Sequence, residues 1–467
     1  SSILPRLAVS SHGMAKSWRG NWRGIDVFSR ALIGLLLFGL AGCLASPEPF
    51  KPTDFARIGV SATSDTRWVV TYVLPKPADE LVFVRQPDDS RAKDWIGGPG
   101  YEIVQIDGVE RIRRVDGRPF SEAVVAVPPL YRSLPKDYAP FSPFGDGGVL
   151  AYTGRLFACP DQCPDNATWQ MLLDAPGRTI LADGKRFRDE ARWTDSADGQ
   201  NVYVGQSAPS ETPDFLAVID AALPETIRTQ LAQQMPHFMH LFAEHLGELP
   251  ERPMLFASYD LAHKNGMGRQ GGTLPGQVFV HFYGSGWTGQ MTAPGFTEQL
   301  AWHFAHEAAH LYQHQVFTDT GSGAWIHEGG AEAMAAIALS LDGQADAVKP
   351  HIAALADKCR KLLGERTIRG ALNESDFDVA YACGIQVSLA IDADLRARFP
   401  DKDGLFAVWR RYIARVGSRQ AVEADFLAAV ADVGGADLAS RIETMVSTPN
   451  PVLPTAQLPT QAGSASW

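Results

Sequence analysis

The residues best suited to chemistry lie in one histidine-rich stretch, AWHFAHEAAHLYQHQ, at positions 301–315. It holds four of the twelve histidines in the chain, including His306 and His310. Side chains four positions apart lie on one face of a helix, so these two imidazoles can bind one metal ion. Glu307 lies one position round the helix, and its carboxylate can reach a water molecule on that ion. The spacing H-E-x-x-H therefore predicts a catalytic zinc site, with a histidine-rich helix face that binds no metal as the alternative.

A catalytic zinc ion needs a third protein ligand, because such sites use three ligands and leave one position open. A glycine at 313 and a histidine at 316 would complete one known arrangement, but the chain has Gln313 and Val316. His314 should lie too far along the helix axis to join His310 at the same ion. We interpret His303 and His314 as solvent-facing residues or as residues that support the ligands.

A second predicted helix, at about 325–341, supplies the missing carboxylate. Its segment WIHEGGAEAMA contains Glu328 and, one turn later on the same face, Glu332. With the histidines, it resembles the gluzincins, the thermolysin-like zinc peptidases. In the aminopeptidase-N and glycyl-aminopeptidase families the third ligand lies in a W-[LI]-x-E-G-[FG]-[AT]-E motif. The resemblance implies Zn²⁺ on His306, His310 and Glu328, with Glu332 accepting a hydrogen bond from His306.

Two further stretches extend this comparison. VAYACGIQVSLAIDADLRARF, at 379–399, resembles the Y-x-K-G helix of the same families, which implies that the Tyr381 hydroxyl stabilises the transition state; Cys383 stands where the families usually have lysine. Aminopeptidases of these families also carry a glutamate on a glycine-rich edge strand that binds the substrate amine. The corresponding stretch RQGGTLPGQVFVHFYGSG has no glutamate, so the sequence leaves exo- and endopeptidase cleavage open.

The resemblance implies a zinc metallopeptidase acting on a peptide or protein substrate. Zinc would lower the pKa of a water molecule towards about 7, Glu307 would take the water proton and pass it to the leaving amine, and Tyr381 would hydrogen-bond the oxyanion. We expect the strand at 276–284 to hold the peptide extended by edge-strand addition. The alternative is a catalytically inactive peptidase-like binding or scaffold lipoprotein of the cell envelope.

The N-terminus has the features of a targeting segment. A basic region after Met14 precedes an apolar run, Ala31 to Gly42, that is too short to span a bilayer as a helix. Leu40 to Cys43 resembles a bacterial lipobox, which implies a lipoprotein signal peptide over 1–42 and a lipid anchor on Cys43. An ordinary signal peptide with an incidental cysteine is the alternative. Because no aspartate follows the cysteine, we expect a membrane anchor in the bacterial outer membrane, facing the periplasm.

Composition and cysteine usage agree with an exported globular protein. The net charge is -11 without a basic block, which argues against a nucleic-acid partner. Four cysteines remain besides Cys43, and an even number in an exported chain favours disulfides. We expect the local pairing among three connectivities, Cys159–Cys163 and Cys359–Cys383. A metal role for CPDQC is less favoured, because no second Cys/His pair lies near it.

The distribution of apolar residues predicts an α+β multidomain chain. After a tether at 43–60, short β-branched and aromatic runs broken by Gly, Pro and Asp predict a β-sandwich-like domain over 61–205. The resemblance to the gluzincins implies a thermolysin-like peptidase domain over 210–447, with an α/β part at 210–320 and a mostly helical part at 321–447. The Pro/Ser-rich segment 448–467 is predicted to be a disordered tail.

Overall fold

The computed structural model describes residues 56–449 except positions 135–136, 161–162, 165, 213–214, 262–265, 314–320, 322, 401 and 418, together with residues 451 and 458–459. These residues belong to one compact unit, residues 50–467. The predicted signal peptide, Cys43, the tether up to residue 55 and His314 lie outside the described residues. Within the described part, none of the helices is long and apolar enough to cross a membrane.

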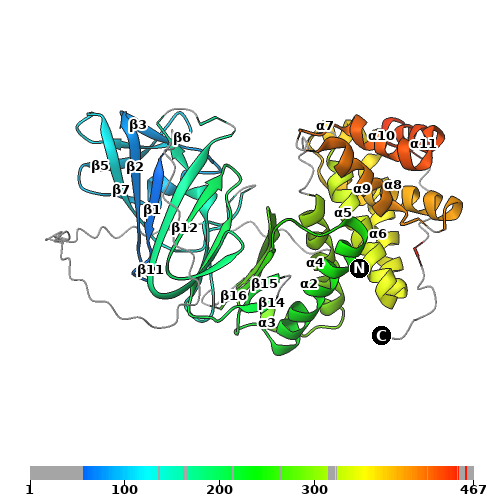
Figure 1. Ribbon diagram of the computed structural model, residues 1–467, viewed down its shortest axis with the longest axis horizontal. Helices are drawn as coiled ribbons and strands as arrows, with labels where there is room; N and C mark the ends of the chain where they lie inside the picture. The colour runs from blue at the N-terminus through cyan, green and yellow to red at the C-terminus, as the bar shows by residue number, and fades with distance from the viewer. Residues whose placement is uncertain are drawn as a thin grey trace, which may run out of the picture. The chain divides into compact units, whose positions relative to one another are not determined.

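Two antiparallel-rich sheets form the N-terminal β domain (Figure 1), as the alternating strand patterns predict. In β2 (Trp68–Ala78), every second side chain from Trp68 to Leu74 is buried, so one strand face enters the core between the sheets. The first sheet has the order β4 (Ile96–Gly97), β7 (Phe120–Val127), β2, β1 (Arg57–Ser61), β11 (Thr168–Ala182), β13 (Asn201–Gly205), β9 (Val149–Tyr152) and β8 (Phe141–Pro143), with β12 (Lys185–Ser196) beside β11. The second has the order β10 (Ala158–Cys159), β3 (Glu80–Phe83), β6 (Val109–Arg114) and β5 (Tyr101–Ile106).

The folded domain starts earlier than its predicted boundary. Strand β1 begins at Arg57, within the range predicted as a tether, and pairs in parallel with β11 and antiparallel with β2. Its buried residues Ile58 and Val60 belong to the domain core. The short apolar alternation of RIGVS is a strand pattern that the neighbouring prolines and charged residues obscure in the sequence. Helix α1 (Ser90–Asp94) and the 3-10 turn η1 (Thr153–Arg155) connect strands of this domain.

A five-stranded mixed sheet opens the second domain. Its order is β14 (Ser210–Thr212), β15 (Phe215–Ile219), β16 (Met254–Asp260), β18 (Gln277–Tyr283) and β17 (Gly268–Leu274). Strands β15, β16 and β18 are parallel, and β17 runs antiparallel to β18 at the edge. The expectation that the strand at 276–284 forms the edge is therefore wrong. The chain reverses after Leu274 through Gly276, whose positive φ of 67° suits glycine. Strand β18 lies inside the sheet because it pairs with β17 on one side and β16 on the other.

Helices cover this sheet and follow one another along the described chain as far as Ser447 (Figure 1). Buried residues of α2 (Glu225–Leu246) and α4 (Phe296–Gln313) share one hydrophobic core with β15, β16 and β18. The remaining helices follow in chain order: α3 (Trp287–Gln290), α5 (Ala324–Leu339), the π-helical turn η2 (Ser340–Gln344), α6 (Ala345–Leu363), α7 (Ile368–Asn373), α8 (Asp378–Arg398), α9 (Leu405–Val416), α10 (Glu423–Gly434) and α11 (Ala436–Ser447).

Glycine contacts allow α5 and α8 to approach closely. A Cβ atom added at Gly329 would lie 2.2 Å from the backbone carbon of Gly384. Because neither backbone can move without moving its helix, only glycine fits at this crossing. The contact brings the N-terminal halves of both helices together, and these halves carry Glu328 and Tyr381.

Two disulfides support the two domains, with the same local pairing that the sequence favours. One joins Cys159 to Cys163 in the β domain, and the other joins Cys359 on α6 to Cys383 on α8. Both cysteines of the second pair are fully buried.

The end of the chain also contacts the helical core, which corrects the prediction of a disordered tail over its whole length. Leu458 packs against the main hydrophobic core, and the Ser340 hydroxyl donates a hydrogen bond to the Pro459 carbonyl at 2.5 Å. Leu458 and Pro459 both belong to the Pro/Ser-rich segment whose composition favoured disorder.

Candidate metal centre

Helices α4 and α5 bring the three predicted ligands together. The Nε2 atoms of His306 and His310 lie 3.0 Å apart. The Glu328 Oε2 atom lies 3.4 Å from His306 Nε2 and 3.3 Å from His310 Nε2. These three ligand atoms all lie within 4.8 Å of one another, which is close enough to hold one metal ion, and the described part of the chain has no other such group of three or more His, Cys, Asp or Glu residues.

This donor set fits a zinc ion. Two imidazole nitrogens and one carboxylate oxygen are the usual ligands of catalytic zinc. The Glu328 Oε2 atom is buried and makes no hydrogen bond in the described structure, so a bound cation would satisfy it. Burial opposes ionisation of Glu328, but His310 and His306 lower the pKa of its carboxyl well below the usual range. The carboxylate is therefore charged and ready to bind a cation.

A side-chain oxygen faces the second ring nitrogen of each ligand histidine. His306 Nδ1 lies 3.5 Å from Glu332 Oε1, and Trp302 Nε1 donates to the other Glu332 oxygen at 2.6 Å. At this distance His306 Nδ1 makes no hydrogen bond, so the hydrogen bond from His306 to Glu332 stays a prediction. His310 Nδ1 lies 2.6 Å from Gln313 Oε1. Such partners orient a histidine and fix which nitrogen faces the metal.

Gln313 was not identified from the sequence as a functional residue. Its side chain is fully buried, and its Nε2 atom donates to the His327 carbonyl at 3.0 Å. It therefore links His310 on α4 to the residue before Glu328 on α5. One sequence feature could have identified Gln313. It lies three residues after His310, and this spacing places both side chains on one helix face.

Glu307, the predicted general base, is held from two sides. The Thr273 hydroxyl on β17 lies 2.7 Å from Glu307 Oε2 and 3.1 Å from its backbone oxygen. His303 Nδ1 lies 3.5 Å from Glu307 Oε1, so His303 supports the base rather than facing solvent. Burial raises the pKa of Glu307, but the neighbouring histidines and the Thr273 hydrogen bond bring it below its usual value. The side chain is therefore a carboxylate that can accept a proton.

Tyr381 lies on the other helix that faces the ligands. Its ring stacks on the His306 ring with centroids 5.9 Å apart. Burial and the nearby negative charge of Glu328 raise the pKa of the Tyr381 hydroxyl. A hydroxyl that keeps its proton can donate a hydrogen bond to an anionic oxygen.

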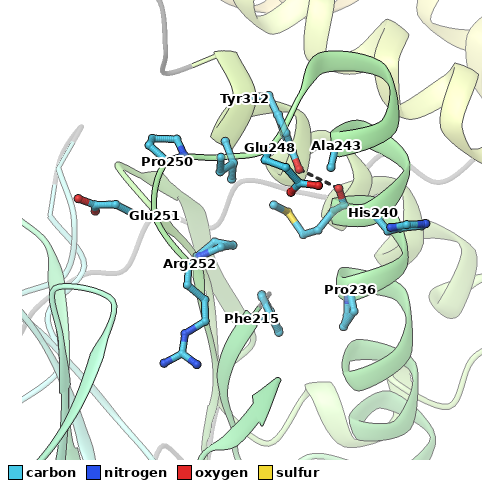
Figure 2. Close-up of a pocket in the computed structure, with 12 residues that line it drawn as sticks. Phe215, Pro236, His240, Ala243, Glu248, Pro250, Glu251, Arg252 and Tyr312 are labelled. Atoms are coloured by element: carbon cyan, nitrogen blue, oxygen red, sulfur yellow. Dashed lines mark hydrogen bonds between the residues drawn. The ribbon is translucent and has the colours of Figure 1, made fainter. Parts of the chain in front are cut away.

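A separate pocket of about 230 Å³ lies between α2 and the segment that precedes β16 (Figure 2). Tyr312, two residues after His310, donates to the Met239 carbonyl at 2.7 Å on its wall. Pro236 and Arg252 also line it. None of the candidate metal ligands lines this pocket.

The fold is that of the M1 zinc metallopeptidases, in agreement with the predicted two-domain α+β architecture. A Deinococcus radiodurans M1 zinc metallopeptidase variant bound to a Tyr-Ser-Ala substrate matches with a TM-score of 0.51 and 15% identity, over 86% of this chain and 95% of that chain. Yeast LTA4 hydrolase in complex with bestatin matches with a TM-score of 0.54 and 13% identity, over 86% of this chain and 69% of that one. No protein-family model matches the chain, and no curated protein does.

Proposed function

We propose that this protein is a zinc metallopeptidase that hydrolyses peptide bonds. The observation that carries the proposal is the convergence of His306, His310 and Glu328 on one point, with the Glu307 carboxylate beside the two histidines and the Tyr381 hydroxyl beside Glu328. The likeness to M1 zinc metallopeptidases supports the same reaction class. Three ligands leave a position open for the reactants, which distinguishes a catalytic site from a structural one.

The chain's own residues divide the work of hydrolysis. Zinc, when bound to His306, His310 and Glu328, supplies Lewis-acid polarisation of the carbonyl and of water. The Glu307 carboxylate accepts a proton from the attacking water and returns it to the departing amine, as a general base and then a general acid. The Tyr381 hydroxyl donates a hydrogen bond to the carbonyl oxygen as negative charge develops on it. Thr273 and His303 hold Glu307 in place for both proton transfers.

The sharpest test of the reaction is the Glu307→Gln variant. It keeps the size of the side chain and one acceptor oxygen for the Thr273 hydroxyl, but it cannot accept the water proton. We expect one zinc per chain, as in the wild type, and a fall in kcat of about 10²- to 10⁴-fold on a mixed peptide library. Turnover equal to the wild type would contradict the role of Glu307. Zinc in the wild type with no turnover of any peptide would favour the catalytically inactive binding or scaffold protein.

We also propose that the protein is a lipoprotein anchored through Cys43 in the bacterial cell envelope, in the outer membrane and facing the periplasm. The lipobox-like segment before Cys43 and the two disulfides, which form in oxidising compartments, support this location. In the Cys43→Ser variant the protein should leave the membrane fraction. Retention of that variant in the membrane would argue against the lipid anchor.

A further inference from the structure

Strand β17 presents one row of side chains to helix α4. Thr273 reaches Glu307, and a Cβ atom added two residues earlier, at Gly271, would lie 3.2 Å from His303 Nε2. Side chains alternate along a strand, so Arg269, two residues earlier again, belongs to the same row. Gln270 belongs to the opposite face, where its amide bonds the backbone of Asp137 and Ala139. Arg269 therefore lies on the face of the edge strand that borders the catalytic residues.

The charge of Arg269 has no close partner. Among the described residues, its guanidinium makes no ion pair or hydrogen bond, and β17 itself contains no acidic residue. The Arg269 side chain is exposed, so its N–H donors are open to a ligand. Charged donors without protein acceptors favour an anionic ligand that supplies them.

The position of Arg269 suits the recognition of a bound peptide. In the described residues, β17 pairs on one side only, with β18, so its outer edge can add an extended peptide. Arg269 lies four residues from Thr273, which is about 13 Å along a strand. A group on the peptide within about four residues of the scissile bond would thus come within reach of the guanidinium.

The chemistry of that group follows from the guanidinium. Its planar fork of N–H donors matches a carboxylate in two parallel hydrogen bonds, and it has no acceptor for an amine. A positively charged N-terminal amine at the same place would be repelled. The carboxylate can come from the C-terminus of the substrate or from an Asp or Glu side chain.

We propose that Arg269 is a specificity-determining residue that selects peptides with a carboxylate close to the scissile bond. This inference rests on the proposed peptidase function and names its substrate class. It assigns the edge strand to anion recognition, in place of the recognition of a free amine.

The test is a panel of N-acetylated peptides that differ only in charge. One pair has Asp or Asn near the cleavage point, and a second pair has a free or an amidated C-terminus. We expect the wild type to show a kcat/KM about 10- to 100-fold higher for the carboxylate member of at least one pair. The pair that shows the preference identifies the source of the carboxylate. The Arg269→Gln variant should cleave both members of that pair equally, whereas Arg360→Gln, which changes an exposed arginine on α6, should keep the preference.

A binding measurement separates failure of this inference from failure of the proposed function. The same panel is titrated against the zinc-loaded Glu307→Gln variant and against Glu307→Gln combined with Arg269→Gln. We expect the dissociation constants to show the carboxylate preference in the first protein and not in the second. Absence of cleavage with a preserved Kd preference would overturn only the peptidase assignment. Equal Kd values within both pairs, or a preference that survives without Arg269, would overturn the role of Arg269.

Discussion

At the scale of single residues, the candidate centre joins side chains whose importance was visible in the sequence to others whose importance was not. The spacing of His306, Glu307 and His310 on one helix is local, so helix geometry alone predicts their common face. Thr273 lies far away in the sequence, and its contact with Glu307 depends on how β17 packs against α4. Sequence patterns that have a local period cannot predict such a contact.

The Thr273 hydroxyl should raise the turnover number by holding Glu307. Thr273→Val keeps the side-chain shape but removes the donor to Glu307 Oε2. We expect kcat to fall about 10-fold, because a hydrogen bond to a charged group contributes about 1.5–3 kcal/mol, while KM and zinc content change little. Thr273→Ser should restore most of the rate. Equal kcat values for the Val and Ser variants would show that the hydroxyl does not position the base.

Gln313 should strengthen metal binding by orienting His310. Gln313→Leu removes the acceptor that lies 2.6 Å from His310 Nδ1. We expect the zinc dissociation constant, measured by competition with a chelator, to rise about 10- to 100-fold. Gln313→Glu keeps the acceptor for His310 Nδ1 but loses the donor to the His327 carbonyl, so it should bind zinc more tightly than the Leu variant. Unchanged zinc affinity in the Leu variant would show that Gln313 does not support metal binding.

At the scale of the elements, the third ligand and Tyr381 depend on how closely α5 and α8 pack. The two helices and the matching motifs on them could be predicted from the sequence, but the contact of Gly329 with Gly384 could not, since helix crossings are non-local. The same reason explains the edge-strand error. The sequence predicts the strand at 276–284, yet only the tertiary pairing of β18 with both β16 and β17 shows that this strand lies inside the sheet.

Gly384 should be essential for this helix crossing. In Gly384→Ala the new Cβ would lie 2.6 Å from the Trp325 carbonyl oxygen and 2.8 Å from Gly329 Cα, so the helices must separate. Alanine favours a helix over glycine by about 1 kcal/mol, but the overpacking at the crossing outweighs this gain. We therefore expect a net loss of about 1–3 kcal/mol in the free energy of unfolding, measured with urea. Gly289→Ala, at a position with open space, should change stability by less than about 0.5 kcal/mol. Similar stability of the two variants would contradict the packing argument.

At the scale of the whole molecule, the fold can be recognised although the sequence matches no protein-family model. The described residues keep the M1 peptidase architecture at 13–15% identity because a fold requires buried apolar faces and close helix crossings, not particular residues. The β domain and the helical half could be predicted from strand and helix periodicity. The start of the β domain at Arg57 and the contacts of Leu458 could not, since both are short segments whose order comes from the core that they join.

The most direct test of the account is the metal content of the purified chain beside its His310→Ala variant, measured by elemental analysis. Two imidazoles and the Glu328 carboxylate converge within 4.8 Å, so we expect one zinc per chain in the wild type. Loss of the His310 ligand should reduce the zinc to a small fraction while circular dichroism shows the same fold. A correctly folded wild-type protein that contains no metal and takes up none from zinc-containing buffer would contradict the proposed centre and, with it, the peptidase reaction.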